Sequence, residues 1–262
     1  MSANDWSFET KQIHAGYNID PATGATALPI YQTSSYAFED TTQAASRFAL
    51  QELGPIYTRL TNPTTDAVAS RIAALEGGVG GLLVSSGQSA TALSILALAV
   101  AGNNVVASPS LYGGSVTLLK NTLGRLGIEA RFVPDPLDPE AWRALADDKT
   151  VAFFGETIPN PQGDILDIEP IAKVAHEVGV PLIVDNTVAT PYLVRPIEWG
   201  ADIVVHSATK YLGGHGTSIA GAIVDSGNFD FASQPERFPL YNEPDESYHG
   251  LVYARDLGVG GA

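Results

Sequence analysis

Three side chains in this sequence could together do chemistry on an aldehyde and a pyridine ring. Lys210 follows an apolar run and stands among small and polar residues, where a solvated lysine gains little. Asp185 and Tyr112 each follow another apolar run. A desolvated lysine amine is a nucleophile for an aldehyde. A carboxylate keeps a pyridine nitrogen protonated, which makes the ring an electron sink. The face of a tyrosine can stack on that ring.

A second group of residues is suited to a phosphate. The segment SSGQSA predicts a small-residue turn that opens a helix, where the backbone amides of Gly87 and Gln88 could bind an anion. Ser207 and Thr209 add hydroxyl groups, and Arg59 in IYTRLTNPT is the best candidate for a phosphate-binding arginine. Residues suited to an aldehyde, to a ring nitrogen and to a phosphate together predict pyridoxal 5'-phosphate as the cofactor. Lys210 would carry it.

Each of these residues alone also has a plain structural explanation. The turn at Gly87 could be ordinary helix capping, Asp185 could cap a helix, and Tyr112 could be a surface aromatic. Their convergence after successive apolar runs is what favours a site. We expect His215 to be a hydrogen-bonded structural residue rather than a catalyst.

The elements that must position these residues alternate along the chain from Thr64 onward. Thr64-Thr65-Asp66 can cap a helix through Leu75, which Gly77-Gly78 stops. Further helices are predicted at Ser89–Ala101, at Ser115–Leu126 with Gly124 as a weak point, from about Pro139, and at Ile168–Val178. Apolar runs predict strands at Gly81–Val84, Val105–Ala107, Glu129–Val133, Val151–Phe154, Leu182–Val184, Ile203–Val205 and Ala220–Val224.

This alternation predicts an α/β domain with a mostly parallel central sheet, because parallel strands need crossover connections that helices supply. In such a sheet ligands bind beyond the carboxyl ends of the strands. Apart from Arg59, which precedes the first predicted strand, the candidate residues follow strand ends, as do Glu156 and Asn160 in GETIPNP. We assign residues 64–262 to this domain and residues 1–63 to an irregular N-terminal arm.

Composition excludes several other classes of partner. Among 262 residues, 14 Lys and Arg stand against 29 Asp and Glu, for a formal charge of −15. We therefore expect no nucleic-acid partner, because binding a phosphate backbone needs surplus basic charge. The chain has no cysteine and its five histidines lack metal-ligand spacing, so we expect no metal site.

No segment predicts a membrane association. The longest near-apolar stretch, Ala90 to Ala101, is too short to span a bilayer. The segment Met1 to Thr10 is polar and does not resemble a signal peptide. We expect a cytoplasmic protein.

A nicotinamide-dependent oxidoreductase is a competing class with a similar sheet. It needs a G-x-G-x-x-G turn after an early strand, and GLLVSSGQSA lacks that spacing. The short-chain dehydrogenase pair, a tyrosine four residues before a lysine, is also absent, because His206 occupies that place before Lys210.

Over essentially its whole length the sequence resembles the Cys/Met-metabolism family of fold-type I pyridoxal-phosphate enzymes. The segments that carry the resemblance are IYTRLTNPT, SSGQSA, SLYGG, GETIPNP, VDNTVATPYL and VVHSATKYLGGHG, and the last two are highly specific. The resemblance implies the large domain of that fold, with Lys210 as the Schiff-base lysine. It further implies Asp185 on the ring nitrogen, Tyr112 stacked on the ring, Asn160 near the ring hydroxyl, and Gly87, Gln88, Ser207 and Thr209 on the phosphate.

The resemblance also implies an assembly. In this family Tyr57 and Arg59 would reach the phosphate of a neighbouring subunit's site, so residues 1–63 would form an arm shared between subunits. The protein is then expected to be an obligate oligomer, usually a homotetramer built as a dimer of dimers.

Two segments resemble the members of the family that act on O-acetylhomoserine. They are IHAGYNIDPATGATALPIYQTSSYAF and RFPLYNEPDESYHG. The activity implied is γ-replacement, in which the substrate amine displaces Lys210, acetate leaves, and sulfide or a thiol adds to give homocysteine or methionine. Lys210 and Tyr112 are the catalytic residues that we expect. Cystathionine γ-synthases and methionine γ-lyases share nearly every site residue and stay open as alternatives.

One feature departs from the family pattern. Its members continue into a smaller C-terminal domain, which supplies the arginine that holds the substrate carboxylate. No residue here matches that arginine, and the chain stops at Gly260-Gly261-Ala262. We therefore expect the C-terminal domain to be missing, which leaves a non-catalytic fragment that binds pyridoxal phosphate as the alternative of another class.

Overall fold

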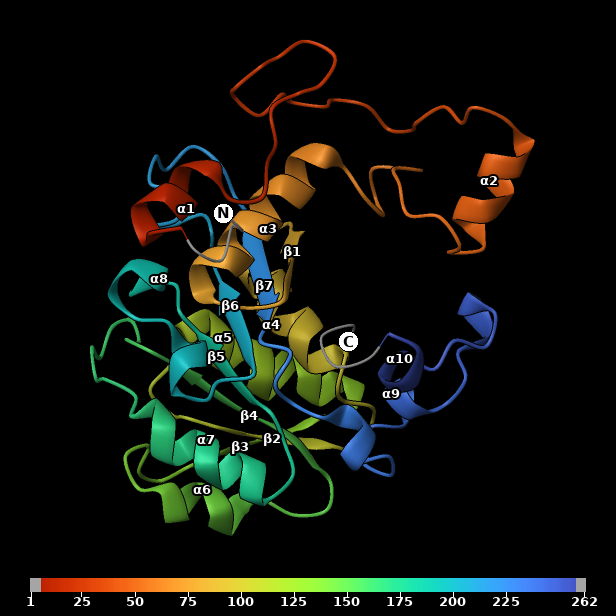
Figure 1. Ribbon diagram of the computed structural model, residues 1–262. Helices are drawn as coiled ribbons and strands as arrows, with labels where there is room; N and C mark the ends of the chain where they lie inside the picture. The colour runs from red at the N-terminus through yellow and green to blue at the C-terminus, as the bar shows by residue number, and fades with distance from the viewer. Residues whose placement is uncertain (1–5, 258–262) are drawn as a thin grey trace.

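A seven-stranded sheet forms the centre of the computed structural model, which describes residues 6–257 (Figure 1). Part of the segment Met1 to Thr10 lies outside these residues, and so does all of Gly260 to Ala262. In chain order the strands are β1 (Gly80–Val84), β2 (Asn104–Ala107), β3 (Glu129–Phe132), β4 (Thr150–Glu156), β5 (Leu182–Asp185), β6 (Ile203–His206) and β7 (Gly221–Asp225).

The strands lie in the order β1-β7-β6-β5-β4-β2-β3. From β3 to β6 all neighbours pair in parallel, whereas β7 pairs antiparallel with both β6 and β1. The sheet is therefore mostly parallel, as the sequence predicted, with β7 as the strand that runs in the opposite direction.

Helices and short turns connect the strands. The first five α-helices are α1 (Phe8–His14), α2 (Thr41–Phe48), α3 (Pro63–Glu76), α4 (Gly87–Leu96) and α5 (Gly113–Thr117). A π-helical segment, η2 (Leu118–Leu123), and a 3₁₀ turn, η3 (Gly124–Leu126), continue α5. The remaining elements are α6 (Pro139–Leu145), α7 (Ile168–Glu177), α8 (Thr190–Leu193), η4 (Pro196–Trp199), η5 (Phe231–Ser233), α9 (Pro239–Asn242), η6 (Glu246–Tyr248) and α10 (Tyr253–Asp256).

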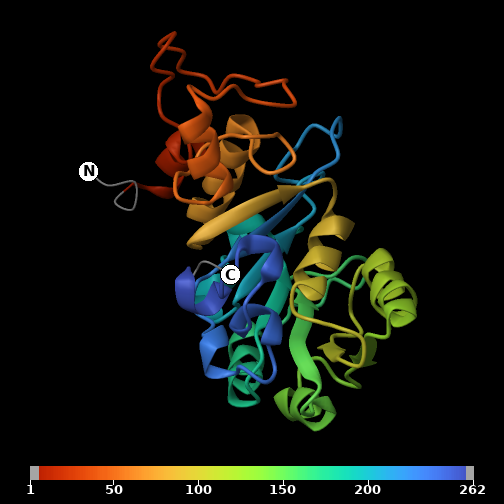
Figure 2. The same cartoon turned by 90° about the vertical axis from the view of Figure 1, so that its right-hand side faces the viewer.

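The two faces of the sheet bury separate apolar clusters. Helices α3, α6 and α7 cover one face, called the α3 face, and α4, η2 and the segment from η5 to α9 cover the other, called the α4 face (Figure 2). Along β5, Leu182 and Val184 belong to the cluster on the α3 face and Ile183 to that on the α4 face. Because alternate side chains of a strand point to opposite faces, Asp185 lies on the α4 face and His206 on the α3 face.

The start of α3 and the end of α4 both differ from the predicted boundaries. The cap of α3 is Asn62, whose side chain accepts the N–H of Thr64 at 2.9 Å, and Pro63 starts the helix because proline has no N–H to leave unpaired. Helix α4 ends at Leu96, five residues before the predicted end. The chain turns there, and Asn103 Oδ1 accepts the N–H of Val100 at 2.8 Å in place of a helical carbonyl.

The N-terminal segment contains two helices that the sequence analysis did not predict. Helix α1 packs against α3, where Arg71 Nε donates to the carbonyl of Ala15 at 2.8 Å. Gly16 follows with φ +77°, and a Cβ atom there would lie 2.2 Å from the carbonyl oxygen of Ala67. Helix α2 and the loops beside it extend away from the sheet (Figure 1). The start of the arm is thus fixed to its own domain, and residues 29–31 are attached again where Thr64 of α3 bonds the backbone of Pro29 and Tyr31.

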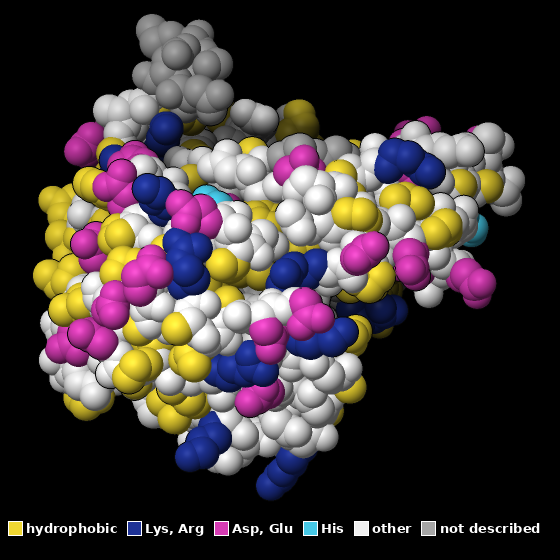
Figure 3. Space-filling model, turned by 90° about the horizontal axis from the view of Figure 1, so that it is seen from below, with side chains coloured by type: hydrophobic (Ala, Val, Ile, Leu, Met, Phe, Trp, Pro, Cys, Tyr) yellow, Lys and Arg dark blue, Asp and Glu magenta, His cyan; other side chains and the backbone are white. Residues whose placement is uncertain are grey.

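The acidic excess of the chain is partly paired at the surface. Arg131 contacts Asp147 at 2.7 Å and Glu129 at 2.9 Å, and Arg143 contacts Glu140 at 3.1 Å. On the face that Figure 3 shows, basic side chains lie among acidic ones. No helix within residues 6–257 has the length and apolar character that crossing a bilayer requires.

Candidate active site

Six strands, β1 to β6, deliver their carboxyl ends to one edge of the sheet. The antiparallel strand β7 begins at the same edge with Gly221, which packs against the turn after β1. A Cβ atom on Gly221 would lie 2.0 Å from the carbonyl oxygen of Ser86, so a residue with a side chain does not fit there. The connection from β6 to β7 therefore leaves and returns at this edge, and it carries the lysine.

The lysine segment, residues 207–220, is held by backbone hydrogen bonds. The N–H of Lys210 donates to the carbonyl of Ser207 at 3.1 Å. The hydroxyl of Thr209 donates to the carbonyl of Ala220 and accepts its N–H, both at 3.1 Å. The Lys210 side chain is exposed in the single chain. The desolvation that we expected at Lys210 is therefore wrong for the single chain, because no described element covers this edge of the sheet.

The turn predicted to bind phosphate lies beside the lysine segment. Ser86 caps α4, its hydroxyl accepting the N–H of Ser89 at 3.1 Å. Gly87 is the first residue of the helix, and a Cβ atom there would lie 2.5 Å from Cβ of Ser207. The N–H groups of Gly87 and Gln88 have no acceptor among residues 6–257. Two free amides at a helix N-terminus thus lie next to a serine hydroxyl, an arrangement suited to an anion.

Asp185 ends β5 with a partly buried carboxylate. Its Oδ1 accepts the N–H of Thr187 at 2.9 Å. Burial raises the pKa of Asp185, while hydrogen bonds from Thr187 and the charge of His206 lower it less. The hydroxyl of Thr187 also accepts the N–H of Ser207 at 2.7 Å. The carboxylate is therefore linked to the phosphate-side serine, and it would be stabilised by a cation brought to its open side.

Glu156 is a second carboxyl group that the sequence analysis noticed without giving it a role. It pairs with Asp185 across β4 and β5 and lies on the same face. Burial, followed by the charge of Asp185, raises the pKa of Glu156 to about 8. Its Oε1 accepts the N–H of Tyr112 at 2.8 Å. The predicted strand was also two residues too short, because Gly155 and Glu156 continue the ladder with β5. The period-two pattern of β4 would have shown this shared face.

Tyr112 lies at the start of α5, with its ring about half exposed at 49%. A Cβ atom on Gly114 would lie 2.5 Å from the Tyr112 ring and 3.2 Å from the side-chain nitrogen of Gln88. The absence of a side chain at Gly114 therefore lets the tyrosine ring lie near the N-terminus of α4. An exposed aromatic face is available there for a planar ligand.

Tyr57 and Arg59 are not brought into this cluster, and Asn160 approaches it only with its backbone, beside Glu156. Tyr57 and Arg59 are exposed in the N-terminal arm, with the Arg59 guanidinium 5.5 Å from the centre of the Tyr57 ring. Among the described residues Arg59 has no carboxylate partner. Asn160 is exposed beyond β4. A role for these side chains needs a ligand or a second subunit.

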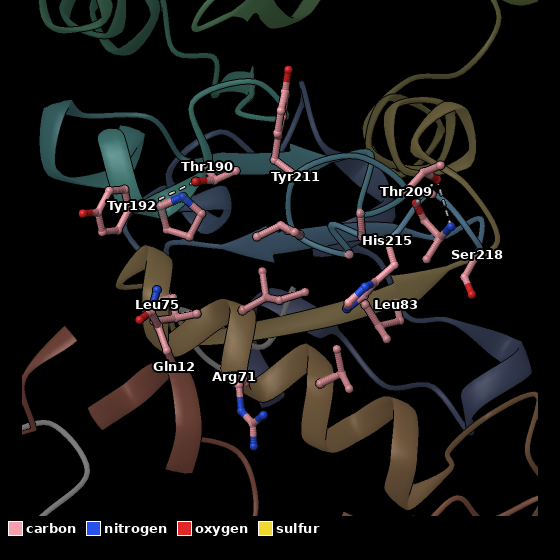
Figure 4. Close-up of a pocket in the computed structure, with 18 of the residues that line it drawn as sticks. Gln12, Arg71, Leu75, Leu83, Thr190, Tyr192, Thr209, Tyr211, His215 and Ser218 are labelled. Carbon is pink, nitrogen blue, oxygen red and sulfur yellow. Dashed lines mark hydrogen bonds between the residues drawn. The ribbon is translucent and has the colours of Figure 1, made fainter. Parts of the chain in front are cut away.

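A cavity of about 630 Å³ lies beside the lysine segment (Figure 4). Gln12 and Leu75 line it from α1 and α3, and Thr209 and Tyr211 from the opposite wall. Lys210 itself, the carboxylates and Tyr112 do not line it, but Thr209, a predicted phosphate ligand, does, so the cavity adjoins the candidate cofactor site through the lysine segment. His215, on its wall, is exposed and makes no hydrogen bond within the described residues, so the hydrogen-bonded role that we predicted for it is wrong.

The side chains at the sheet edge fit pyridoxal phosphate. A carboxylate whose pKa burial has raised suits a protonated ring nitrogen, and two free helix amides suit a phosphate. Lys210 supplies the amine and Tyr112 a free aromatic face. No group of acidic, histidine or cysteine side chains in residues 6–257 could hold a metal ion. Fold and site together define the large domain of a fold-type I pyridoxal-phosphate enzyme.

Comparison with known proteins identifies the family. A sequence profile for the Cys/Met metabolism PLP-dependent enzymes matches residues 9–251, and the chain belongs to that family. It is 53% identical over 261 residues to an O-acetyl-L-homoserine sulfhydrylase of Corynebacterium glutamicum, covering 98% of this chain and 60% of that protein. It is 55% identical over 250 residues to the enzyme of the same name from Leptospira meyeri, covering 95% and 56%.

Solved structures agree with the fold. A putative O-acetylhomoserine (thiol)-lyase from Campylobacter jejuni, solved with a pyridoxyl-lysine monophosphate, superposes with a TM-score of 0.90 at 40% identity. The superposition covers 97% of this chain and 66% of that one. The fold class, the family and pyridoxal phosphate as cofactor, all predicted from the sequence, are confirmed. The chain spans about 60% of the length of the curated relatives it matches.

Replacing Gly87 with alanine tests the close contact between the two cofactor-binding segments. The new methyl group would overlap Ser207, whose Cα would lie 2.8 Å away, so one segment must move. We expect Gly87→Ala to weaken pyridoxal-phosphate binding by about tenfold or more, the equivalent of one charge-assisted hydrogen bond. The dissociation constant can be measured by equilibrium dialysis.

Gly113→Ala is the matched control, because Gly113 also begins a helix at this edge and a Cβ atom there meets nothing within 4 Å. It should leave the affinity nearly unchanged. Equal affinities for the Gly87 and Gly113 variants would contradict the predicted contact between cofactor and turn.

Proposed function

We propose that this protein catalyses γ-replacement on O-acetylhomoserine with sulfide or a thiol, giving homocysteine or methionine and acetate. The observation that carries the proposal is the meeting of Lys210, Asp185 and Tyr112 with the N-terminus of α4 at one sheet edge. The relatives add support, because several are named as O-acetylhomoserine sulfhydrylases or homocysteine synthases.

Each side chain at the edge has a distinct task in this reaction. Pyridoxal phosphate, when bound, supplies an electron sink for negative charge at the substrate carbons. Asp185 holds the proton on the ring nitrogen, and Tyr112 orients the ring by stacking. Lys210 holds the cofactor through its amine and, once the substrate amine has replaced it, moves protons at Cα and Cβ of the substrate.

Binding of the phosphate is assigned to the turn at the start of α4 and to the lysine segment. Gly87 and Gln88 offer backbone N–H groups, and the Ser207 hydroxyl has no partner among the described residues. Thr209 can donate to a phosphate only after its hydroxyl leaves the carbonyl of Ala220. Asn160 is assigned to the ring hydroxyl.

The assembly is part of the proposal. We propose that Tyr57 and Arg59 of one subunit reach the phosphate of the next, in a homotetramer built from dimers. Their exposure and the absence of a carboxylate partner for Arg59 within residues 6–257 support this. Such an arm would also cover Lys210, which is exposed in the single chain. A cytoplasmic location is proposed on the amino-acid synthesis for which the relatives are named.

A product assay tests the reaction. We expect the protein, loaded with pyridoxal phosphate and including the C-terminal domain that the family pattern supplies, to form homocysteine from O-acetylhomoserine and sulfide; residues 1–262 alone should bind the cofactor without turnover. The rate should be roughly tenfold or more above that of cystathionine formation or of methionine cleavage. Lys210→Ala should lower it by on the order of 10³ or more, because the amine that moves protons is gone.

Each alternative has its own result in this assay. Faster cystathionine formation or methionine cleavage would place the protein in a different branch of the family. Bound cofactor without turnover of any substrate would support the non-catalytic alternative. Turnover that survives in Lys210→Ala would overturn the role of the lysine.

Subunit exchange tests the arm. We expect Arg59→Ala to weaken cofactor binding by roughly one to two decades, because its guanidinium can make two charge-assisted bonds to a phosphate. When Arg59→Ala subunits are mixed with Lys210→Ala subunits, mixed dimers should form. In such a dimer one site carries both changes and the other carries neither. Borohydride reduction at a cofactor concentration near the wild-type dissociation constant then reports intact sites.

With random exchange about one quarter of all sites are intact, because half of the dimers are mixed and half of their sites are intact, so the mixture should trap about one quarter as much cofactor as the wild-type protein does under the same conditions. If Arg59 acts within its own chain, mixing restores nothing. Exchange itself is confirmed by mass spectrometry of isotope-labelled subunits.

A further inference from the structure

The structure contains a buried ionisable pair that the proposed reaction does not use. Glu76, the last residue of α3, and His206, the last residue of β6, are both fully buried. Oε1 of Glu76 lies 2.6 Å from Nε2 of His206. Burying a carboxylate is costly unless it is hydrogen-bonded, so the contacts of Glu76 need an explanation.

A third buried residue completes the cluster. Asn186 Nδ2 donates to the same Oε1 of Glu76 at 2.9 Å and to the carbonyl of Val194 at 2.9 Å. Its Oδ1 accepts the hydroxyl of Thr157 at 3.1 Å. Oε1 of Glu76 thus forms hydrogen bonds with both Asn186, the residue after β5, and His206, the residue that ends β6.

The chain positions of these two partners matter. Asn186 directly follows Asp185, which we assign to the ring nitrogen, and His206 directly precedes Ser207, which we assign to the phosphate. Because side chains alternate along a strand, Asn186 and His206 turn to the α3 face while Asp185 turns to the α4 face. Glu76 therefore holds the two cofactor-binding segments from behind the sheet.

We propose that Glu76 is a positioning residue for the cofactor: through Asn186 and His206 it holds the Asp185 segment in register with the Ser207–Lys210 segment. On the cofactor side, Thr187 makes the complementary link, accepting from Ser207 and donating to Asp185. The ring nitrogen and the phosphate of one rigid ligand need both segments at a fixed separation, and two links on opposite faces supply it. This inference rests on the proposed binding of pyridoxal phosphate.

A matched control exists at the other end of β6. Asp202 precedes that strand and is buried, 1% exposed. Its Oδ2 lies 2.8 Å from His176 Nε2 and accepts the N–H of Leu182 at 2.8 Å. It is also a carboxylate paired with a histidine, but it lies at the amino end of the sheet, away from the cofactor edge. Replacing Asp202 therefore removes hydrogen bonds similar to those of Glu76 without changing the cofactor site.

The experiment compares Glu76→Ala, Glu76→Gln and Asp202→Ala in the full chain. The readouts are the dissociation constant of pyridoxal phosphate, the visible absorption maximum of the bound cofactor, and the Tm of the cofactor-free protein. We expect Glu76→Ala to raise the dissociation constant about tenfold or more, as expected for the loss of hydrogen bonds to a charged group. Its absorption maximum should also move.

Glu76→Gln should bind within about threefold of wild type, because an amide oxygen accepts the same two bonds. Asp202→Ala should lower Tm and leave cofactor affinity within about twofold, since its contacts lie far from the site. Wild-type affinity in Glu76→Ala, or equal losses of affinity in Glu76→Ala and Asp202→Ala, would overturn the proposal. So would a Glu76→Gln variant that binds as poorly as the alanine variant.

Should Glu76→Ala fail to fold, Asn186→Ala removes only one of the two links. It should raise the dissociation constant by roughly fivefold, and wild-type affinity there would contradict the proposal. If the wild-type protein itself does not bind pyridoxal phosphate, the proposed function and this inference fail together. If the wild-type protein binds pyridoxal phosphate and the variants bind it equally well, only the inference about Glu76 fails.

Discussion

The site depends on the carboxylate of Asp185. It stands at the end of β5 with its pKa raised by burial, and hydrogen bonds from Thr187 compensate only in part. A protonated pyridine ring placed against it supplies the missing positive charge. Since the strand fixes the carboxylate, the ring has one place to lie. The amine, the phosphate turn and the aromatic face must then stand at distances that one planar ligand can bridge.

The sheet topology provides those distances. Parallel strands bring the ends of β2, β4, β5 and β6 to one edge, and the reversal at β7 returns the lysine segment to that edge. Gly87 and Gly221 then allow the turn before α4 to approach β6 and β7 more closely than any side chain permits. Behind the sheet, Glu76 holds the same segments from α3. In the proposed site, positioning of the cofactor is therefore shared between the two faces of the sheet.

The sequence predicted the front of this site because its residues follow a local pattern. Lys210, Asp185 and Tyr112 are polar or aromatic residues at the ends of apolar runs, and each run proved to end at the same edge. The back of the site follows no local pattern. Glu76 contacts His206 across 130 residues of chain and Asn186 across 110, and only the fold brings them together. Two helix ends were missed although their causes are local, because the side chains of Asn62 and Asn103 accept backbone N–H groups only two and three residues away.

The state of the ring nitrogen tests the central claim most directly. Pyridoxal phosphate labelled with ¹⁵N in the ring can be bound to the wild-type protein and to Asp185→Asn, which keeps the shape of the side chain and removes its charge. We expect the ¹⁵N chemical shift of a protonated nitrogen in the wild-type protein at neutral pH and that of a neutral nitrogen in the variant. The same protonated shift in both proteins would contradict this expectation, because Asp185 would then not be the group that holds the proton.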